Sequence, residues 1–449
     1  MFKILSRLSV VALLLLCSCS ALDEVARFVG LSGEAKIDEI AESYVKLVLE
    51  IGLYDSDYVD AYNGPEEWKP AELENDKEKE FPSEKLESEV NKLIERLKKV
   101  NQKKFSSLEK LRYAYLERQL LSVRGKILLL SGKEMTFDEE SQVLYDAIAP
   151  VYNAEYFEDI LQKLDDVLPG EGSIYDRFNA YREEFVIPKD RLEAVFNAAM
   201  AECRRRTQLY IELPEDEKVI LEFVVGKSWG AYNWYKGNSV SLIQINSGLP
   251  VYIDRAVDLA SHEGYPGHHV NLTLLEKRLV TDINWIEYCV YPLFSPRSLI
   301  SEGIAEYGID IIFPGNERVE FEQKVLFPLA GLDPAKAERY YHIINLKKEL
   351  KYALNEAARR YIDGRMNADE VTEWLMKYSL MTPKEAKRAV RFIEQYRSYV
   401  INYSLGEDMV KECIKKHAGE ENSPYKSWGL FYTLLSTPQT PSGLVRFSQ

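Results

Sequence analysis

Three of the five histidines in this 449-residue chain lie within one stretch of eight residues. That stretch reads His262-Glu263-Gly264-Tyr265-Pro266-Gly267-His268-His269. Two imidazoles beside a carboxylate can hold a zinc ion next to a general base, and the HExxH signature does this with histidines at positions i and i+4 of one helix. Pro266 occupies the i+4 position here. The usual motif is therefore absent, and a second metal-binding histidine has to come from further along the chain.

A regular helix cannot bring either later histidine to His262. His268 would lie about 240° around the helix from His262, and His269 about 10.5 Å along its axis. Zinc–nitrogen bonds of about 2.0–2.1 Å cannot bridge such separations. Pro266 cannot donate a hydrogen bond to the carbonyl group of His262 and clashes with it, while Gly267 allows backbone angles closed to other residues. We therefore expect a bulge or kink that absorbs two residues and makes His268 the second ligand, because His269 would need a three-residue bulge.

A third ligand is expected from the helical segment that begins near Pro296. Glu302 and Glu306 share one face of this segment at i, i+4 spacing. Glu302 follows His262 by forty residues, as in zinc peptidases with two histidines and a glutamate. Glu302 is therefore the expected ligand, and Glu306 is either an alternative ligand or a partner behind a ligand. The competing interpretation of Glu302 is a surface carboxylate.

These motifs resemble a known family. His-Glu-x-x-Pro-Gly-His at 262–268, followed by Glu-Gly-x-Ala-x-Tyr at 302–307, is similar to the family catalogued as domain of unknown function 885. Its members are zinc-peptidase-like proteins often found as bacterial lipoproteins. Tyr403-Ser-Leu-Gly406 matches the C-terminal Tyr-x-x-Gly element of the same family. The resemblance covers roughly residues 170–449.

The resemblance implies a gluzincin-like metallopeptidase with one zinc ion. It assigns His262, His268 and Glu302 as metal ligands and Glu263 as the base. Ile304 stands where the family commonly has tryptophan, which leaves the ligands intact but changes the expected shape of the pocket.

The leading hypothesis is hydrolysis of peptide bonds by water that zinc and Glu263 activate. Glu263 would accept the proton of the water and pass it to the leaving amine. The developing oxyanion needs a hydrogen-bond donor. The Tyr-x-x-Gly element favours Tyr403 for this role, and the other candidates are Tyr399, Arg397 and His342.

Two further function classes remain open at this point. One is a zinc-binding surface protein without catalysis, which serves capture or adhesion. Structural zinc sites usually have four protein ligands, commonly cysteines, and do not need a base such as Glu263. The other is a zinc hydrolase of a non-peptide ester or amide, since the water chemistry is the same.

Apolar spacing predicts a mainly helical protein. Helices are expected over 36–53, 82–99, 108–130 and from about 188 to 209, and again from Asp254 onward. Between them, segments rich in β-branched residues over 219–246 predict a small antiparallel sheet. The expected fold is mainly α (α+β), a large helical protein whose sheet lies next to a zinc-binding helix in a thermolysin-like or gluzincin-like core. Segment 239–246 is either an ordinary half-buried strand or one that pairs with an extended peptide substrate.

Composition also predicts how the chain is divided and where it is located. Lys3 and Arg7 lead into an apolar run that is too short to span a membrane, so residues 1–18 are expected to be a signal peptide. Cys19 ends a lipobox-like sequence and is the expected lipid anchor, on the extracytoplasmic side of a bacterial membrane; the alternative is plain secretion. A helical lobe is expected over 19–215 and a catalytic sheet-plus-helix lobe over 216–449, with a boundary soft enough for one continuous domain.

The charge of the chain excludes one class of partner. The formal charge is −15, and removal of residues 1–18 takes two basic residues and no acids, which leaves −17. Such an acidic protein is not expected to bind nucleic acid. The expected partner is a peptide substrate.

Overall fold

The computed structural model describes residues 33–73, 80–227, 229–419 and 423–447. The predicted signal peptide, residues 1–18, and the predicted lipid anchor at Cys19 lie outside these residues. Within the described ranges, no helix has both the length and the apolar character that a membrane span requires.

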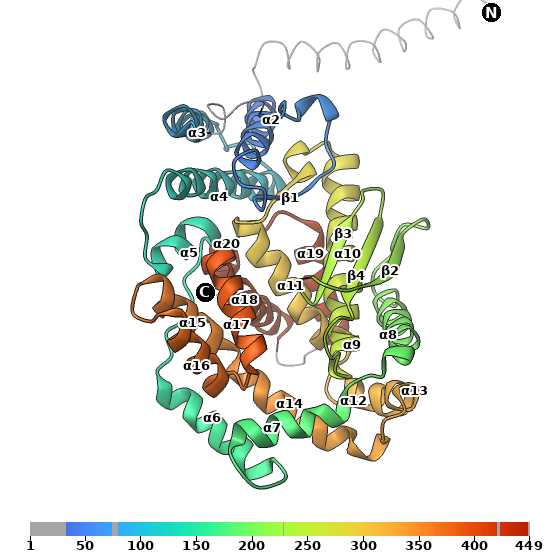
Figure 1. Ribbon diagram of the computed structural model, residues 1–449. Helices are drawn as coiled ribbons and strands as arrows, with labels where there is room; N and C mark the ends of the chain where they lie inside the picture. The colour runs from blue at the N-terminus through green and yellow to red at the C-terminus, as the bar shows by residue number, and fades with distance from the viewer. Residues whose placement is uncertain (1–32, 74–79, 228, 420–422, 448–449) are drawn as a thin grey trace, which may run out of the picture.

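Apart from one short strand at 59–62, the regular secondary structure of the described chain before residue 216 is helical (Figure 1). The predicted helices at 36–53, 82–99 and 108–130 correspond to α2, α3 and α4, and the predicted helix from 188 to 209 contains α8. A capping box between Ser106 and Glu109 starts α4. The helices are α2 (Gly33–Gly52), α3 (Ser83–Lys98), α4 (Ser107–Leu130), α5 (Phe137–Tyr145), α6 (Ala154–Val167), α7 (Ile174–Arg182) and α8 (Leu192–Thr207).

Two small sheets accompany the helices. β1 (Val59–Tyr62) pairs antiparallel with β5 (Val290–Pro292), a pairing of very short strands that the sequence does not indicate. The larger sheet has the order β2-β4-β3, formed by β2 (Lys218–Val224), β3 (Ala231–Tyr235) and β4 (Val240–Asn246). The small antiparallel sheet predicted from the sequence is present in the β3–β4 pair, but the β2–β4 pair differs from that prediction. β3 and β4 form a hairpin through Gly237 and Asn238, both at positive φ, and β4 rather than β3 docks on β2, so β2 and β4 run parallel.

Helices again dominate after the sheet, which confirms the mainly α fold (Figure 1). They are α9 (Asp254–Leu259), α10 (His268–Leu275), α11 (Pro296–Ile312), α12 (Glu317–Phe321), α13 (Phe327–Ala330), α14 (Ala337–Lys348), α15 (Ala353–Ile362), α16 (Ala368–Tyr378), α17 (Pro383–Tyr396), α18 (Ile401–Ala418), α19 (Pro424–Ser436) and α20 (Pro441–Phe447).

Two glycines allow α11 and α18 to cross in direct contact. A Cβ atom on Gly303 would overlap the backbone of Gly406, and a Cβ atom on Gly406 would lie 2.6 Å from the carbonyl oxygen of Leu299. Any larger side chain at these positions would push the helices apart. Because Gly303 follows Glu302, and Gly406 lies one turn after Tyr403, this crossing brings the two predicted site helices together.

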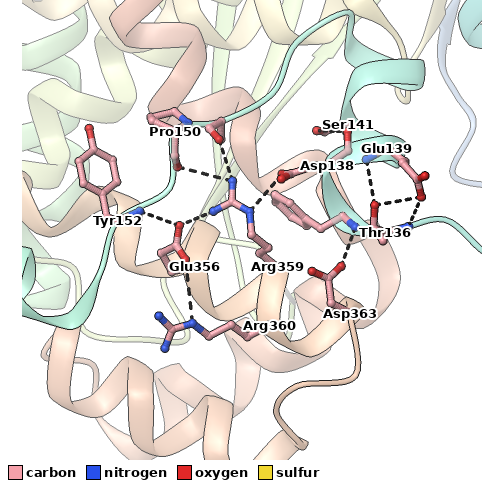
Figure 2. Close-up of polar contacts among 12 residues, drawn as sticks. Thr136, Asp138, Glu139, Ser141, Pro150, Tyr152, Glu356, Arg359, Arg360 and Asp363 are labelled. Atoms are coloured by element: carbon pink, nitrogen blue, oxygen red, sulfur yellow. Dashed lines mark hydrogen bonds and ion pairs between the residues drawn. The ribbon is translucent and has the colours of Figure 1, made fainter.

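A buried polar network joins α5 to α15 (Figure 2). The guanidinium group of Arg359 donates to Asp138 Oδ1 at 3.1 Å and to the carbonyl oxygen of Ala149 at 2.7 Å, and it also pairs with Glu356. The backbone N–H of Phe137 donates to Asp363 Oδ1 at 2.8 Å. These charge-assisted bonds fix the position of α5 within the C-terminal helices.

Candidate metal centre

The helix that carries His262 is broken where the sequence predicts a distortion. After α9, residues Ala260–Gly264 form a π-helical turn, and α10 begins at His268. The backbone N–H of Tyr265 donates to the carbonyl oxygen of Ala260 at 3.0 Å, and that of Gly267 donates to the carbonyl oxygen of Ser261 at 2.9 Å. The Tyr265–Pro266 peptide bond is cis. His268 follows His262 by two residues more than the i, i+4 spacing of HExxH. The π-helical turn and the interruption of the helix before α10 accommodate these two residues.

This break brings His262 and His268 together. Their ring centroids lie 4.7 Å apart at an interplanar angle of 88°. One ligand atom from each of His262, Glu263 and His268 lies within 4.8 Å of the others. Two imidazoles and a carboxylate at this spacing can hold a metal ion.

Glu302 faces both imidazoles from α11. Its Oε2 lies 3.3 Å from Nε2 of His262, and its Oε1 lies 3.6 Å from Nε2 of His268. Metal–ligand bonds of about 2.0–2.1 Å in a tetrahedron separate adjacent ligand atoms by about 3.3 Å. Oε2 is buried and accepts no hydrogen bond among the described residues. A cation between Glu302 and the two rings would supply the interaction that this oxygen lacks, so the residues fit a zinc ion.

Glu306 lies on the other side of the His262 ring. Its Oε1 is 3.3 Å from Nδ1, the nitrogen that points away from Glu302. A carboxylate in this place holds Nδ1–H and leaves the lone pair on Nε2 free for a metal ion. The structure therefore puts Glu306 behind a candidate ligand, one of the two positions considered from the sequence.

The electrostatics of the cluster favour a cation at its centre. Burial alone would lower the pKa of His262, but Glu302, Glu306 and Glu263 raise it well above its usual value. Burial alone would raise the pKa of Glu302, but His268 and His262 lower it strongly. Burial raises the pKa of Glu263. The carboxylates thus create a negative field on the imidazoles that a bound cation would neutralise.

Tyr399 and Tyr403 approach the cluster from the turn before α18 and from its first turn. The hydroxyl group of Tyr399 donates to Glu302 Oε1 at 2.8 Å. Glu140 of α5 holds this turn by accepting hydrogen bonds from the backbone N–H and hydroxyl of Ser398 at 3.1 and 2.6 Å. Burial raises the pKa of Tyr403 well above 10, and the charges of Glu302, Glu306 and Glu263 raise it further. The hydroxyl of Tyr403 therefore keeps its proton near three site carboxylates.

The other donors considered from the sequence lie elsewhere. Arg397 donates to Glu140 Oε2 at 2.6 Å and so supports the turn that carries Tyr399. His342 is exposed on α14, and the contacts of the described residues do not join it to the cluster. The pairing of β4 with an extended peptide is also wrong, because β2 and β3 occupy both edges of β4.

His269 points away from the candidate metal centre into a buried network. Its Nδ1 lies 2.9 Å from Oγ of Ser241, and its Nε2 lies 3.0 Å from Glu217 Oε2. The hydroxyl of Tyr265 donates to the same carboxylate oxygen at 2.6 Å. This network fixes the backbone on both sides of Pro266. Glu217 was missed from the sequence, where it is one of 72 acidic residues with no motif around it.

Substitution of the two adjacent histidines should separate metal binding from folding. His268→Ala should lose zinc and keep most of its stability. His269→Ala should keep about one zinc ion but lower the free energy of unfolding by about 1–3 kcal/mol, because Glu217 and Ser241 lose their partner. Metal analysis of both variants and urea unfolding measure this. Zinc loss in His269→Ala but not in His268→Ala would reverse the assignment.

Glu217 should make the fold sensitive to acid. Burial alone would raise the pKa of Glu217, but hydrogen bonds from His269, Tyr265 and Arg204 lower it from an ordinary 4.5 to about 2. A lowered folded-state pKa contributes stability that is present above pH 4.5 and is lost as the pH falls toward 2. The unfolding free energy of the wild type should therefore approach that of Glu217→Gln between these pH values in urea titrations. A difference that stays constant over this window would contradict the assignment.

Fold and cluster together define a mainly helical protein with a candidate His-Glu-His metal centre. No known protein-family profile and no curated protein matches the sequence. Among solved structures, a predicted lipoprotein from Colwellia psychrerythraea matches with a TM-score of 0.54 and 14% identity over 80% of this chain. This chain spans 66% of the length of that protein. This similarity supports the mainly helical fold and concerns the fold alone.

Two further structures match with lower scores. An M32 carboxypeptidase from Deinococcus radiodurans R1 has a TM-score of 0.46 and 10% identity, with 94% of this chain and 95% of that chain covered. A predicted lipoprotein of unknown function from Shewanella oneidensis has a TM-score of 0.45 and 12% identity, with 81% and 71% covered.

Proposed function

We propose that this protein is a zinc-dependent metallopeptidase of the family catalogued as domain of unknown function 885. The observation that carries the proposal is the arrangement of Glu302 against His262 and His268. Oε2 of Glu302, which accepts no hydrogen bond among the described residues, lies 3.3 Å from Nε2 of His262. Oε1 of the same carboxylate lies 3.6 Å from Nε2 of His268, and both distances are close to the spacing of adjacent ligands around one zinc ion. Three protein ligands leave one coordination position open, as catalytic zinc sites require.

The roles of the chain's own residues follow from their places. His262, His268 and Glu302 would hold a zinc ion, which when bound would supply a Lewis acid and lower the pKa of water toward about 7. Glu263 lies within the same cluster, and burial raises its pKa, which suits a group that accepts a proton from water and returns it to the leaving amine. Tyr403 is protonated and donates a hydrogen bond to the oxyanion. Tyr399 orients Glu302.

An edge strand beside the cluster offers a place for the substrate. β3 pairs with β4 on one side alone among the described residues, and its Asn233 side-chain N–H donates to the carbonyl oxygen of Glu263 at 2.6 Å. An extended peptide can pair with the free edge of such a strand. This puts the peptide backbone next to the base.

The proposal includes attachment to a bacterial membrane by lipid at Cys19, with the enzyme on the extracytoplasmic side. The basic start, the short apolar run and the lipobox-like sequence support it.

Metal analysis and a peptide-cleavage screen on the purified mature protein test the function together. We expect about one zinc ion per chain and cleavage that a chelator abolishes and added zinc restores. If the protein binds one zinc ion but cleaves no peptide in a diverse library, the peptidase proposal is rejected in favour of a zinc-binding surface protein. Cleavage of esters alone would leave a different hydrolase.

A further inference from the structure

A cavity of about 170 Å³ opens between β1 and β3, beside the candidate metal centre. We call it the β1–β3 cavity, and its lining includes Asp60, Tyr62, Asn63, Asn233, Trp234 and Tyr235. One lining residue touches the site directly, since Asn233 donates to the backbone carbonyl of Glu263 at 2.6 Å. Burial raises the pKa of Asp60, the hydrogen bond from Tyr232 lowers it, and the charges of His268 and Glu302 act on it in opposite directions. A substrate group in the cavity would therefore be a near neighbour of the bond that is cleaved.

One carboxylate lines the cavity without an ion pair. Asp60 accepts a hydrogen bond from the hydroxyl of Tyr232, and it takes part in none of the ion pairs found among the described residues. A carboxylate that lines a cavity and forms no ion pair favours a ligand that brings N–H donors and a positive charge.

Aromatic rings complete this environment. The rings of Tyr62 and Trp234 each already attract a lysine ammonium group, from Lys69 at 5.9 Å and from Lys236 at 5.4 Å. The charge of the buried Arg297 lowers the pKa of Asp60, but no ion pair joins the two residues in the described part of the chain. Arg297 lines the adjoining cavity, donates to the carbonyl oxygen of Val290 at 2.8 Å and lies 4.6 Å from the ring centroid of Tyr291. A carboxylate with aromatic walls is a favourable site for an ammonium or guanidinium group.

We infer that the β1–β3 cavity is a specificity subsite for a cationic group of the peptide substrate, held by Asp60. The inference rests on the proposed function. The cation is either a lysine or arginine side chain next to the scissile bond or the free amino terminus of the peptide. Both present N–H donors and one positive charge.

Matched peptides distinguish the two sources. One pair compares lysine with norleucine and a second compares arginine with citrulline, each within amino-terminally acetylated peptides. A third pair compares a free with an acetylated amino terminus in a neutral peptide. Cleavage is measured with the zinc-loaded mature protein, and affinity with its Glu263→Gln variant by calorimetry. We expect at least one cationic member to bind and react at least about tenfold better than its neutral partner.

Asp60→Asn should reduce that preference to within about twofold while zinc content and cleavage of neutral peptides stay near wild type. Glu134→Gln removes the same charge from an exposed residue outside the cavity lining and should keep the preference. Circular dichroism checks folding, and Asp60→Ser replaces the first variant if that one does not fold. A side-chain preference or an amino-terminal preference each supports the subsite when it depends on Asp60.

The inference would be overturned, even if peptides are cleaved, by either of two results. One is equal binding and cleavage of the cationic and neutral members of all three pairs, and the other is a preference that persists in Asp60→Asn. A preference in binding that depends on Asp60, without cleavage of any peptide by the wild type, would keep the subsite and reject the proposed catalysis.

Discussion

Replacement of Glu263 by glutamine should lower kcat for peptide cleavage by about 10²–10⁴-fold. The variant should keep about one zinc ion per chain, because the fit of the site to zinc rests on His262, His268 and Glu302. Glutamine has nearly the same shape but cannot accept a proton from water at neutral pH, so the expected loss is chemical. Metal analysis and steady-state kinetics on one preparation measure both quantities.

Glu306→Gln is the matched control for this variant. It removes a neighbouring charge, but its amide oxygen can still accept a hydrogen bond from Nδ1 of His262. A partner behind a ligand typically changes metal affinity or activity by about 10–100-fold, so its effect should be smaller than that of Glu263→Gln. Retained activity in Glu263→Gln would remove Glu263 from the role of base.

Gly267→Ala should abolish zinc binding and destabilise the fold by about 3 kcal/mol or more. The added Cβ atom would overlap the carbonyl oxygen of His262 and lie 2.5 Å from that of Ser261. Both atoms belong to the π-helical turn, so the backbone would have to move at the point where His262 is positioned. Zinc affinity by competition with a chelating dye and urea unfolding measure the two effects.

Gly429→Ala controls for the general effect of replacing a glycine. It lies within α19, and an added Cβ atom meets no atom within 4 Å. Alanine in a helix interior should leave stability within about 1 kcal/mol of the wild type, and on the favourable side. Wild-type zinc affinity in Gly267→Ala would show that the close approach of this backbone is not required for the site.

The distortion at Pro266 is predictable because it depends on local covalent geometry. A proline that cannot donate and a glycine that can adopt unusual angles stand between two histidines that a regular helix keeps apart. The mainly helical fold is predictable for a similar reason. The periodic spacing of apolar residues that indicates α2, α3 and α4 is a local pattern, contained within each helical segment itself. The place of Glu302 near both histidines was suggested by its spacing along the chain.

What the sequence could not reveal depends on contacts between distant segments. Glu217 meets His269, and Tyr399 meets Glu302, across separations of 52 and 97 residues that carry no local signal. Asp60 lies on a strand too short to be recognised. The parallel pairing of β2 with β4 was missed because the order of strands in a sheet is decided by docking, whereas the pattern of each strand shows only that it is extended.

The hydrogen bonds of Glu140 have a consequence for how the protein could be divided. Glu140 holds the turn at Ser398, 258 residues later, and that turn places Tyr399 on Glu302. Asp60, which we infer binds a cationic group of the substrate, also lies far upstream of every candidate ligand. A fragment that starts at residue 216 would keep the whole set of candidate ligands, but it would lack both Glu140, which holds the turn that carries Tyr399, and Asp60. For the proposed peptidase, the smallest active unit is therefore larger than the segment that carries its motifs.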